Sequence, residues 1–182
     1  NQINTGDDVS GTIKTSVGGV AFNISKQLAL SGFRNVELLT ALGDDTQGRT
    51  IIDFCNELGI ITDNIYVCNN SKTDSYLAIE DIKGLKAAIA HIVNVEEFGY
   101  RILKPLENGA VETNSEPSRN LIVLDGNLSI ATLSKIAENK KFMNYDIRIA
   151  SASSSKAIRL KPFLSLPNVT IYCNMAEAEN LC

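Results

Sequence analysis

The feature that most constrains the fold of this chain is a regular alternation of strand-like and helix-like apolar segments. Apolar runs of strand length, such as residues 121–124, are each followed by a stretch with apolar residues at helical spacing. Val20, Ile24 and Leu28 show that spacing first, and Gly32 can end this helix. Strands that alternate with helices predict an α/β fold with a mostly parallel sheet, covered by helices on both faces.

The expected strands of the sheet are residues 36–42, 65–68, 121–124, 146–150 and 169–173. The expected helices are residues 20–31, 46–58, 130–137 and 155–160, a short piece beyond 94, and a last helix from 176. Residues 76–79 and 85–90 flank a turn at 81–84, which predicts a hairpin that is an appendage of the sheet. The polar residues 107–119 are expected to form a surface loop.

Composition excludes several classes of protein. The chain has 182 residues, of which 44% are hydrophobic and 21% charged, and its net charge is −4. These values are typical of one folded domain and exclude wholesale disorder. The mild acidic excess gives no field that would hold nucleic acid or an anionic membrane. No apolar stretch approaches the roughly 18 residues of a membrane span, so neither nucleic acid nor a membrane is expected as a partner.

The four cysteines, Cys55, Cys68, Cys173 and Cys182, are far apart in the sequence. Zinc ligands normally occur in close pairs, and a chain of this length can build a core without disulfides. Cys55 and Cys173 lie in apolar segments, where we expect small buried side chains. Reduced thiols indicate a cytosolic or nuclear protein, and the cytoplasm is the expected location.

The first distinctive motif is Gly18-Gly19 with Asn23, at the start of the first expected helix. The glycines let a ligand approach the backbone, and a helix N-terminus supplies free N–H groups. The Asn23 amide suits a hydroxylated ligand. A tight turn into a helix explains the same residues equally well.

Gly43-Asp44-Asp45-Thr46-Gln47-Gly48 connects an expected strand to a helix. Aspartate and threonine cap helices and glycines form turns, so capping is the favoured interpretation.

Asp125-Gly126-Asn127 follows the strand at 121–124. Ligands of open parallel sheets bind beyond the carboxyl ends of the strands, where a carboxylate can accept from sugar hydroxyls. A helix cap for the segment that begins near Ser129 is an equal alternative.

Asn174 and Glu177 follow the last expected strand. A carboxylate at this place can hold Mg²⁺ through water. The N-x-x-E spacing is also that of a capping box, which is the better interpretation of these residues alone. The one histidine, His91, lies in the expected hairpin and is interpreted as an ordinary strand residue.

Taken together and in this order, these segments resemble the PfkB (ribokinase-like) carbohydrate kinase family. The resemblance is most specific over residues 16–59. Residues 73–78, 88–90 and 125–129 are similar to the pseudouridine kinase subgroup. Related fungal domains lie beside a pseudouridine glycosidase, so this chain is compatible with the kinase domain of a bifunctional protein. The family has a ribokinase-like three-layer α/β/α fold with a small β-lid.

The resemblance implies a site for a small-molecule nucleoside or sugar. Gly18, Gly19 and Asn23 would bind the ribosyl hydroxyls, and Asp125 and Asn127 would lie close to the same substrate. The family transfers phosphate from ATP to a sugar hydroxyl, and the favoured reaction is conversion of pseudouridine to pseudouridine 5′-phosphate.

The resemblance also implies roles for two further sets of residues. Asn174 and Glu177 would organise Mg²⁺ and the ATP phosphates through water. Residues 12–15 and 73–91 would form the β-lid, which in this family closes on the sugar and often forms a homodimer. Potassium activation is an open question.

The resemblance also implies that residues 1–182 are a partial kinase domain, incomplete at both ends. The first strand of the family is expected before Asn1 and the catalytic Asp beyond Cys182, so no catalytic residue is assigned and this piece is expected to be inactive alone. His91 and Ala150-Ser151 replace residues usual in the family. They leave two alternatives: a ribokinase or another nucleoside kinase, and a non-catalytic module that binds a nucleoside or another protein.

Overall fold

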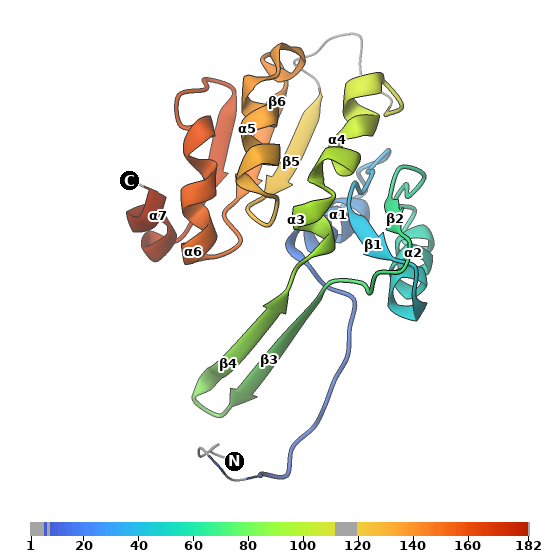
Figure 1. Cartoon of the computed structure of the whole chain (residues 1–182), viewed down its shortest axis with the longest axis vertical. Helices are drawn as coiled ribbons and strands as arrows, with labels where there is room; N and C mark the ends of the chain where they lie inside the picture. Colours follow the sequence, from blue (N-terminus) through green and yellow to red (C-terminus); the bar gives the residue numbers. More distant parts are fainter. Residues whose placement is uncertain (1–5, 7, 112–119, 182) are drawn as a thin grey trace.

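A computed structural model describes residues 6, 8–111 and 120–181 of the chain (Figure 1). An α/β body carries a long antiparallel hairpin that projects from one end. The elements are α1 (Val20–Leu30), β1 (Ala41–Gly43), α2 (Thr46–Glu57), β2 (Tyr66–Cys68), β3 (Ser75–Asp81), β4 (Gly84–His91), α3 (Asn94–Glu97), α4 (Gly99–Asn108), β5 (Leu121–Asp125), α5 (Ile130–Glu138), η2 (Lys140–Phe142), β6 (Asp146–Ala150), α6 (Ser154–Ala157), η3 (Ile158–Phe163), β7 (Val169–Tyr172) and α7 (Met175–Leu181).

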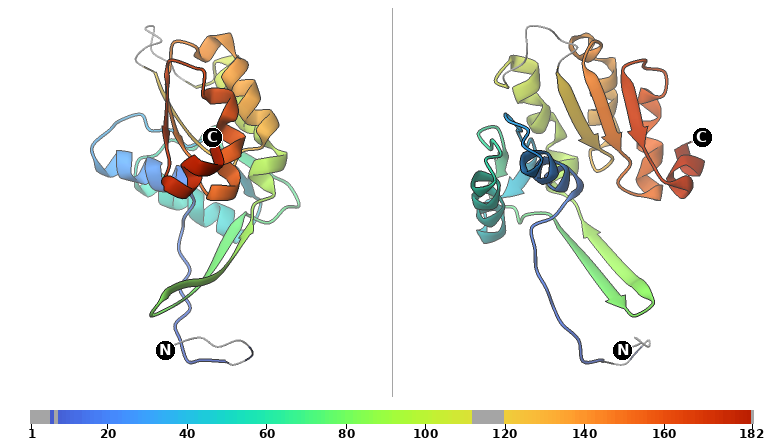
Figure 2. Two further views of the ribbon diagram at one scale, coloured as in Figure 1. Left: turned by 90° about the vertical axis from the view of Figure 1, so that its left-hand side faces the viewer. Right: turned by 180° about the vertical axis from the view of Figure 1, so that it is seen from behind.

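The body contains two parallel sheets, with strand orders β1-β2 and β5-β6-β7. In the larger sheet Asp125 lies opposite Ala150, and Ala150 lies opposite Tyr172. The carboxyl ends of all three strands therefore meet at one edge. Helix α1 lies on one face of this sheet and α5 on the other (Figure 2). The prediction of a mostly parallel α/β fold with helices on both faces is confirmed.

An open cleft separates the two sheets. Within the described residues, β1 pairs only with β2, and β5 pairs on one side only, with β6. Residues of both strands line this cleft. Its walls therefore include the carboxyl end of β5, where sequence analysis placed a candidate ligand group.

The core has two parts. The larger cluster lies beneath the β5-β6-β7 sheet, where Leu133, Ile149 and Leu160 are fully buried. A smaller cluster joins α1 and α2 through Phe22 and Cys55. Each helix thus buries its apolar stripe against a strand or a neighbouring helix, which is the source of most helix stability in proteins.

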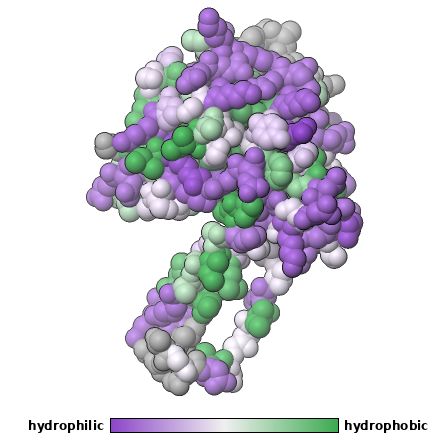
Figure 3. Space-filling view, viewed as in Figure 1, coloured by the Kyte–Doolittle hydropathy of each residue, from purple (hydrophilic) through white to green (hydrophobic). Residues whose placement is uncertain are grey.

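Among the described residues, no helix or strand covers the hairpin of β3 and β4. Leu77 pairs with Ile89 across the strands, and both side chains are more than half exposed. Figure 3 shows the resulting apolar surface along the hairpin. Apolar patches of this kind mark surfaces that bind a partner or a ligand. The predicted hairpin is confirmed, including its place outside the sheets.

Three local predictions were wrong. The strand expected at 36–42 pairs regularly only over β1, with one bridge between Glu37 and Ile61, because the neighbouring segment turns at 62–64 before β2 begins. Helix α4 includes residues 107 and 108 of the expected loop and ends at Gly109, whose φ is 79°. Cys173 is exposed rather than buried, because it follows the last paired residue of β7, which pairs only with β6 within the described residues.

Residues 112–119 of the expected loop lie outside the described residues. Residues 12–15 are exposed and carry no strand. No helix in the described part of the chain has the length and apolar character needed to cross a membrane.

The packing of α5 gives a stability prediction. Replacing the fully buried Leu133 by Ala removes a core side chain and leaves a cavity, so the free energy of unfolding should fall by about 2–5 kcal/mol. Leu121 is 49% exposed, and Leu121→Ala is the matched control, with an expected loss of less than about 1 kcal/mol. Urea unfolding measures both. Equal losses in the two variants would contradict the described core.

Candidate substrate-binding site

The N-terminus of α1 opens onto the cleft. Gly19 adopts a φ of 102°, a left-handed conformation that favours glycine, and it begins the helix by accepting the Asn23 amide at 2.9 Å. The N-cap residue of this helix, Gly19, has no side chain that could cap it, and the first turn contains no acidic residue. Gly18, Gly19 and Asn23 all line the cleft. Apart from the Ala21 amide, which donates to Asp125, the amides of the first turn can donate to acceptor groups of a ligand.

The carboxylate of Asp125 lies beside this helix end. It accepts hydrogen bonds from the backbone amides of Asn127, at 2.7 Å, and of Ala21 in α1. Burial raises the pKa of the Asp125 carboxyl above its usual value, and these hydrogen bonds and the nearby Lys156 oppose that rise. The motifs at residues 18–23 and 125–127, predicted separately, therefore meet in one place.

Asn127 connects Asp125 to a cation. The Lys156 ammonium donates to Asn127 Oδ1 at 2.7 Å, and both residues line the cleft. Gly126 permits this arrangement because a Cβ there would collide with the carbonyl of Ser151 on the neighbouring strand end. The equal alternative, a helix cap, is formed by another residue: Ser129 Oγ accepts from the Thr132 amide and caps α5. Asp125 is thus left facing the cleft.

The second motif both caps a helix and anchors the hairpin. Asp45 accepts the Gly48 amide at 2.8 Å, which is the predicted cap of α2. The same carboxylate accepts the Thr73 hydroxyl at 2.7 Å and the Thr73 amide at 2.9 Å. A Cβ at Gly43 would collide with the backbone of residues 71–73. Capping explains only part of this motif, because the rest holds the segment that leads into β3.

Asp74, which follows Thr73 in the same leg, ties the two legs of the hairpin together. Its carboxylate accepts the backbone amides of Val93, Asn94 and Val95 at 2.9–3.1 Å, at the start of α3. The fully buried Asn94 side chain donates to the Lys72 carbonyl. Sequence analysis did not identify this network. A single Asp before a strand gives no signal that it caps a helix about twenty residues later.

Asn174 and Glu177 form the capping box that sequence analysis favoured. The Asn174 amide donates to Glu177 Oε2 at 2.8 Å, and the Glu177 amide donates to Asn174 Oδ1 at 2.9 Å. The Ser151 hydroxyl and the Asn174 amide lower the pKa of Glu177. Neither Asn174 nor Glu177 lines the cleft. Both follow β7, on the same sheet edge as Asp125.

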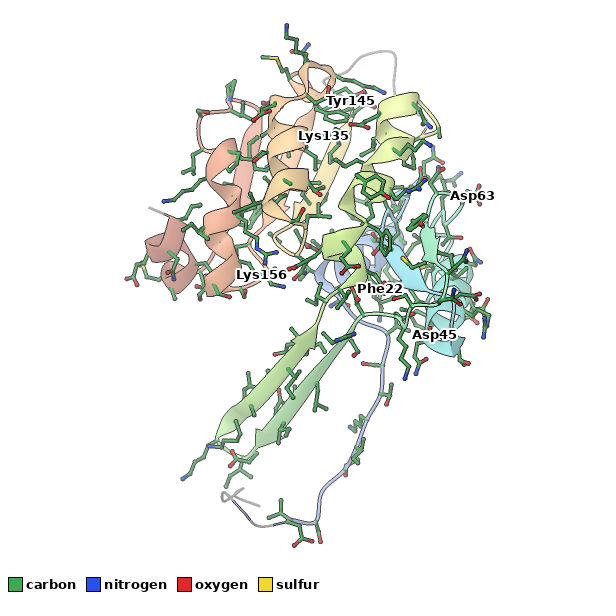
Figure 4. All side chains as sticks on the ribbon, viewed as in Figure 1. Phe22, Asp45, Asp63, Lys135, Tyr145 and Lys156 are labelled. Atoms are coloured by element: carbon green, nitrogen blue, oxygen red, sulfur yellow. The ribbon has the colours of Figure 1, made fainter. Side chains whose placement is uncertain are left out.

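The site residues thus fall into two groups. Five of them lie together around the cleft: Gly18, Gly19, Asn23, Asp125 and Asn127. His91, at the end of β4, also lines the cleft. Figure 4 shows Lys156 at the lower edge of the β5-β6-β7 sheet and Asp45 near the root of the hairpin. The described residues contain no group of three or more His, Cys, Asp or Glu side chains that could hold a metal ion. A cation near Glu177 therefore fits only through water and a bound phosphate group.

The geometry defines a class of protein: an α/β body whose sheet edge and helix N-terminus form a polar cleft, with a hairpin rooted beside it. Residues 4–182 match the pfkB family carbohydrate kinase profile. The match covers almost the whole chain, so the chain belongs to the pfkB family of carbohydrate kinases, as its motifs predicted.

Similar proteins agree with this assignment. A pseudouridine kinase from Escherichia coli (strain K12) is 28% identical over 179 residues, which are 98% of this chain and 54% of that protein. A carbohydrate kinase structure from Agrobacterium tumefaciens aligns with all of this chain and 57% of its own, with a TM-score of 0.79 and 24% identity. The ADP complex of ribokinase from Cryptococcus neoformans var. grubii serotype A has a TM-score of 0.62 at 15% identity, covering 100% of this chain and 53% of its own. The structural likenesses show a ribokinase-like fold, and the chain spans about half the length of these relatives.

Asp125 gives a prediction that separates binding from stability. Because its pKa is raised, the protonated carboxyl stabilises the fold below the ordinary pKa, and this contribution is lost as the pH rises through the raised value. At pH 7 the ionised group therefore costs stability. Asp125→Asn should leave the free energy of unfolding at pH 7 unchanged or higher, yet should weaken binding of the nucleoside that is proposed below as the ligand, by about tenfold or more. Urea unfolding and calorimetry measure the two effects.

The matched control for Asp125 is Asp53→Asn, on the exposed side of α2, which should change neither quantity. A loss of stability in Asp125→Asn without a loss of binding would contradict the assignment of Asp125 to the site.

Asp45 should have the opposite pH dependence. Hydrogen bonds from Thr73 and Gly48 lower its pKa, so its contribution to stability is present above the ordinary pKa and is lost as the pH falls through the lowered value. Asp45→Ala should destabilise the protein by about 1–2 kcal/mol at pH 7. The deficit should shrink in acid, as unfolding curves at several pH values would measure.

The neighbouring Asp44 carries only an exposed ion pair with Arg49, so Asp44→Ala is the control, with little expected effect. An Asp45→Ala deficit that grows as the pH falls would contradict the anchoring role of Asp45.

Proposed function

We propose that this chain forms part of an ATP-dependent kinase that phosphorylates a nucleoside hydroxyl, with the 5′-hydroxyl of pseudouridine as the favoured acceptor. The observation that carries the proposal is the meeting of the α1 N-terminus, whose N-cap is Gly19, with the partly buried carboxylate of Asp125 in one cleft. Membership of the pfkB family and similarity to a pseudouridine kinase support the reaction type and the favoured acceptor.

In this proposal the ribosyl group lies between α1 and β5. Asp125 accepts hydrogen bonds from two ribosyl hydroxyls, since an ionised carboxylate is an acceptor only. The amides near Gly18 and Gly19 donate to the hydroxyl oxygens, and the Asn23 side chain supplies either a donor or an acceptor. Several directed hydrogen bonds fix the sugar, and this holds the acceptor hydroxyl in one orientation for transfer.

ATP and Mg²⁺ are assigned to the other end of the same sheet edge. Asn174 and Glu177 would contact the metal and the phosphates through water, because both side chains also complete the capping box. Mg²⁺, when bound, neutralises charge on the transferred phosphoryl group. No described residue is assigned as the catalytic base, and we assign that group to a part of the protein outside this chain.

The hairpin is the proposed lid. Its legs are fixed by Asp45 and Asp74, and its base reaches the cleft through Tyr76 and His91. Both of its faces carry apolar residues, with Leu77 and Ile89 on one face and Tyr76 on the other. One face can cover the substrate while the other packs on a second copy of the chain, so we propose a homodimer through the hairpin.

The full-length protein that contains this chain should be incubated with ATP, Mg²⁺ and, in separate reactions, pseudouridine, uridine, adenosine or ribose. Formation of ADP and of the phosphorylated product is the measurement, and pseudouridine should give the highest kcat/KM. Turnover of ribose but not of pseudouridine would identify a ribokinase instead. Nucleoside binding measured by calorimetry, without ADP formation from any acceptor, would indicate a non-catalytic binding module.

A further inference from the structure

Lys156 lies where the substrate cleft meets the root of the hairpin. It belongs to the short helix α6, directly after the loop that follows β6, and its side chain is partly buried. Its ammonium donates to Asn127 Oδ1 at 2.7 Å. The charged groups around it are Asp125 at the end of β5, Asp74 at the hairpin root, Glu96 of α3 and Arg159 of η3. Lys156 is thus placed between the proposed ribosyl subsite and the proposed lid.

The neighbouring cation, Arg159, makes different contacts from those of Lys156. Arg159 donates to Glu96 Oε1 at 2.7 Å and to the carbonyls of Asn127 and Leu128 at 3.3 and 3.2 Å. These contacts fasten α3 to the loop after β5, which is a structural role. Lys156 makes the contact with Asn127, and a lysine ammonium has three N–H donors. Since Lys156 lines the cleft, its donors can reach a bound molecule there.

The two sides of the cleft differ in the groups they can recognise. Asp125 accepts hydrogen bonds and therefore suits hydroxyl donors, whereas an ammonium only donates and suits a carbonyl oxygen. Partial burial and Arg159 lower the pKa of Lys156, while the surrounding carboxylates oppose this. A charged donor in a partly dehydrated place gives a stronger and more selective hydrogen bond than an exposed one.

We propose that Lys156 is a specificity-determining residue, which donates a hydrogen bond to a carbonyl oxygen of a nucleobase attached to the ribosyl group. This inference rests on the proposed function and deepens it, since it selects nucleosides with a carbonyl-bearing base over free sugars. Lys156 lies near both Asp125 and Asp74 at the hairpin root, so a base that extended from a ribosyl group at Asp125 toward the hairpin would pass Lys156, and the lid would then enclose the contact. The chemistry recognised is a neutral ring with exocyclic carbonyl groups.

The test compares two C-ribosides with the full-length protein. Pseudouridine has a base with two carbonyl groups, and the C-riboside of benzene keeps the ribose, the carbon–carbon glycosidic bond and a six-membered ring without them. Calorimetry should give a lower Kd for pseudouridine in the unsubstituted protein. Lys156→Met should raise the Kd for pseudouridine about tenfold or more, and should change the Kd for the benzene riboside less than threefold.

The control is Lys161→Met, an exposed lysine of η3, which should alter neither Kd. Circular dichroism and the unfolding midpoint check that each variant is folded. If Lys156→Met does not fold, Lys156→Gln, which keeps one polar group at this place, provides the same comparison and should give an intermediate loss of preference.

The outcomes are distinguishable. Equal weakening of both ligands would show that Lys156 acts only by holding Asn127, and would overturn the inference. An unchanged preference for pseudouridine in both variants would also overturn it, and would leave the proposed kinase intact. Failure of the unsubstituted protein to bind either riboside would instead count against the proposed function itself, and the inference would fall with it.

Discussion

The carboxylate of Asp125 makes one of the contacts that join the two halves of the body. It ends β5 in the larger sheet, and it accepts an amide of α1, which packs with the part of the chain that contains the smaller sheet. The sheets share no strand pairing within the described residues, so packing joins them as well: α1 packs on β5, and α3 and α4 pack on β1, where Ala41 belongs to the same core as the larger sheet. Burial raises the pKa of the Asp125 carboxyl, so its ionised form is less favourable here than in water.

Other polar groups lie along the same edge of the larger sheet. Parallel strands bring their carboxyl ends together, so residues about fifty apart in the sequence, Asp125 and Asn174, follow strands of one sheet. The N-termini of α5, α6 and α7 follow these strand ends, and the N-terminus of α1 lies beside the end of β5. Helix α7 is capped reciprocally by Asn174 and Glu177, whereas the N-cap of α1 is Gly19 and its Ala21 amide donates to Asp125.

Much of this arrangement could be predicted from the sequence. The periodicity identified the elements because each buries one stripe or face, and the order of strands and helices predicted the parallel sheet. The meeting of Gly19 with Asp125 required the resemblance to a known family, since nothing local relates two segments so distant in sequence. Pairing could not be foreseen either: the strand expected from residue 36 failed because its partner turns away, and Cys173 proved exposed because β7 pairs only with β6 within the described residues.

The double attachment of the hairpin has a mechanical consequence. One leg is held through Thr73 by Asp45, and Asp74 in the same leg accepts the first amides of α3, which ties the two legs together at their root. The second leg continues into α3, which packs against β1. Any tilt of the hairpin would therefore carry both legs together, because neither leg can slide along the other without breaking the hydrogen bonds of Asp74.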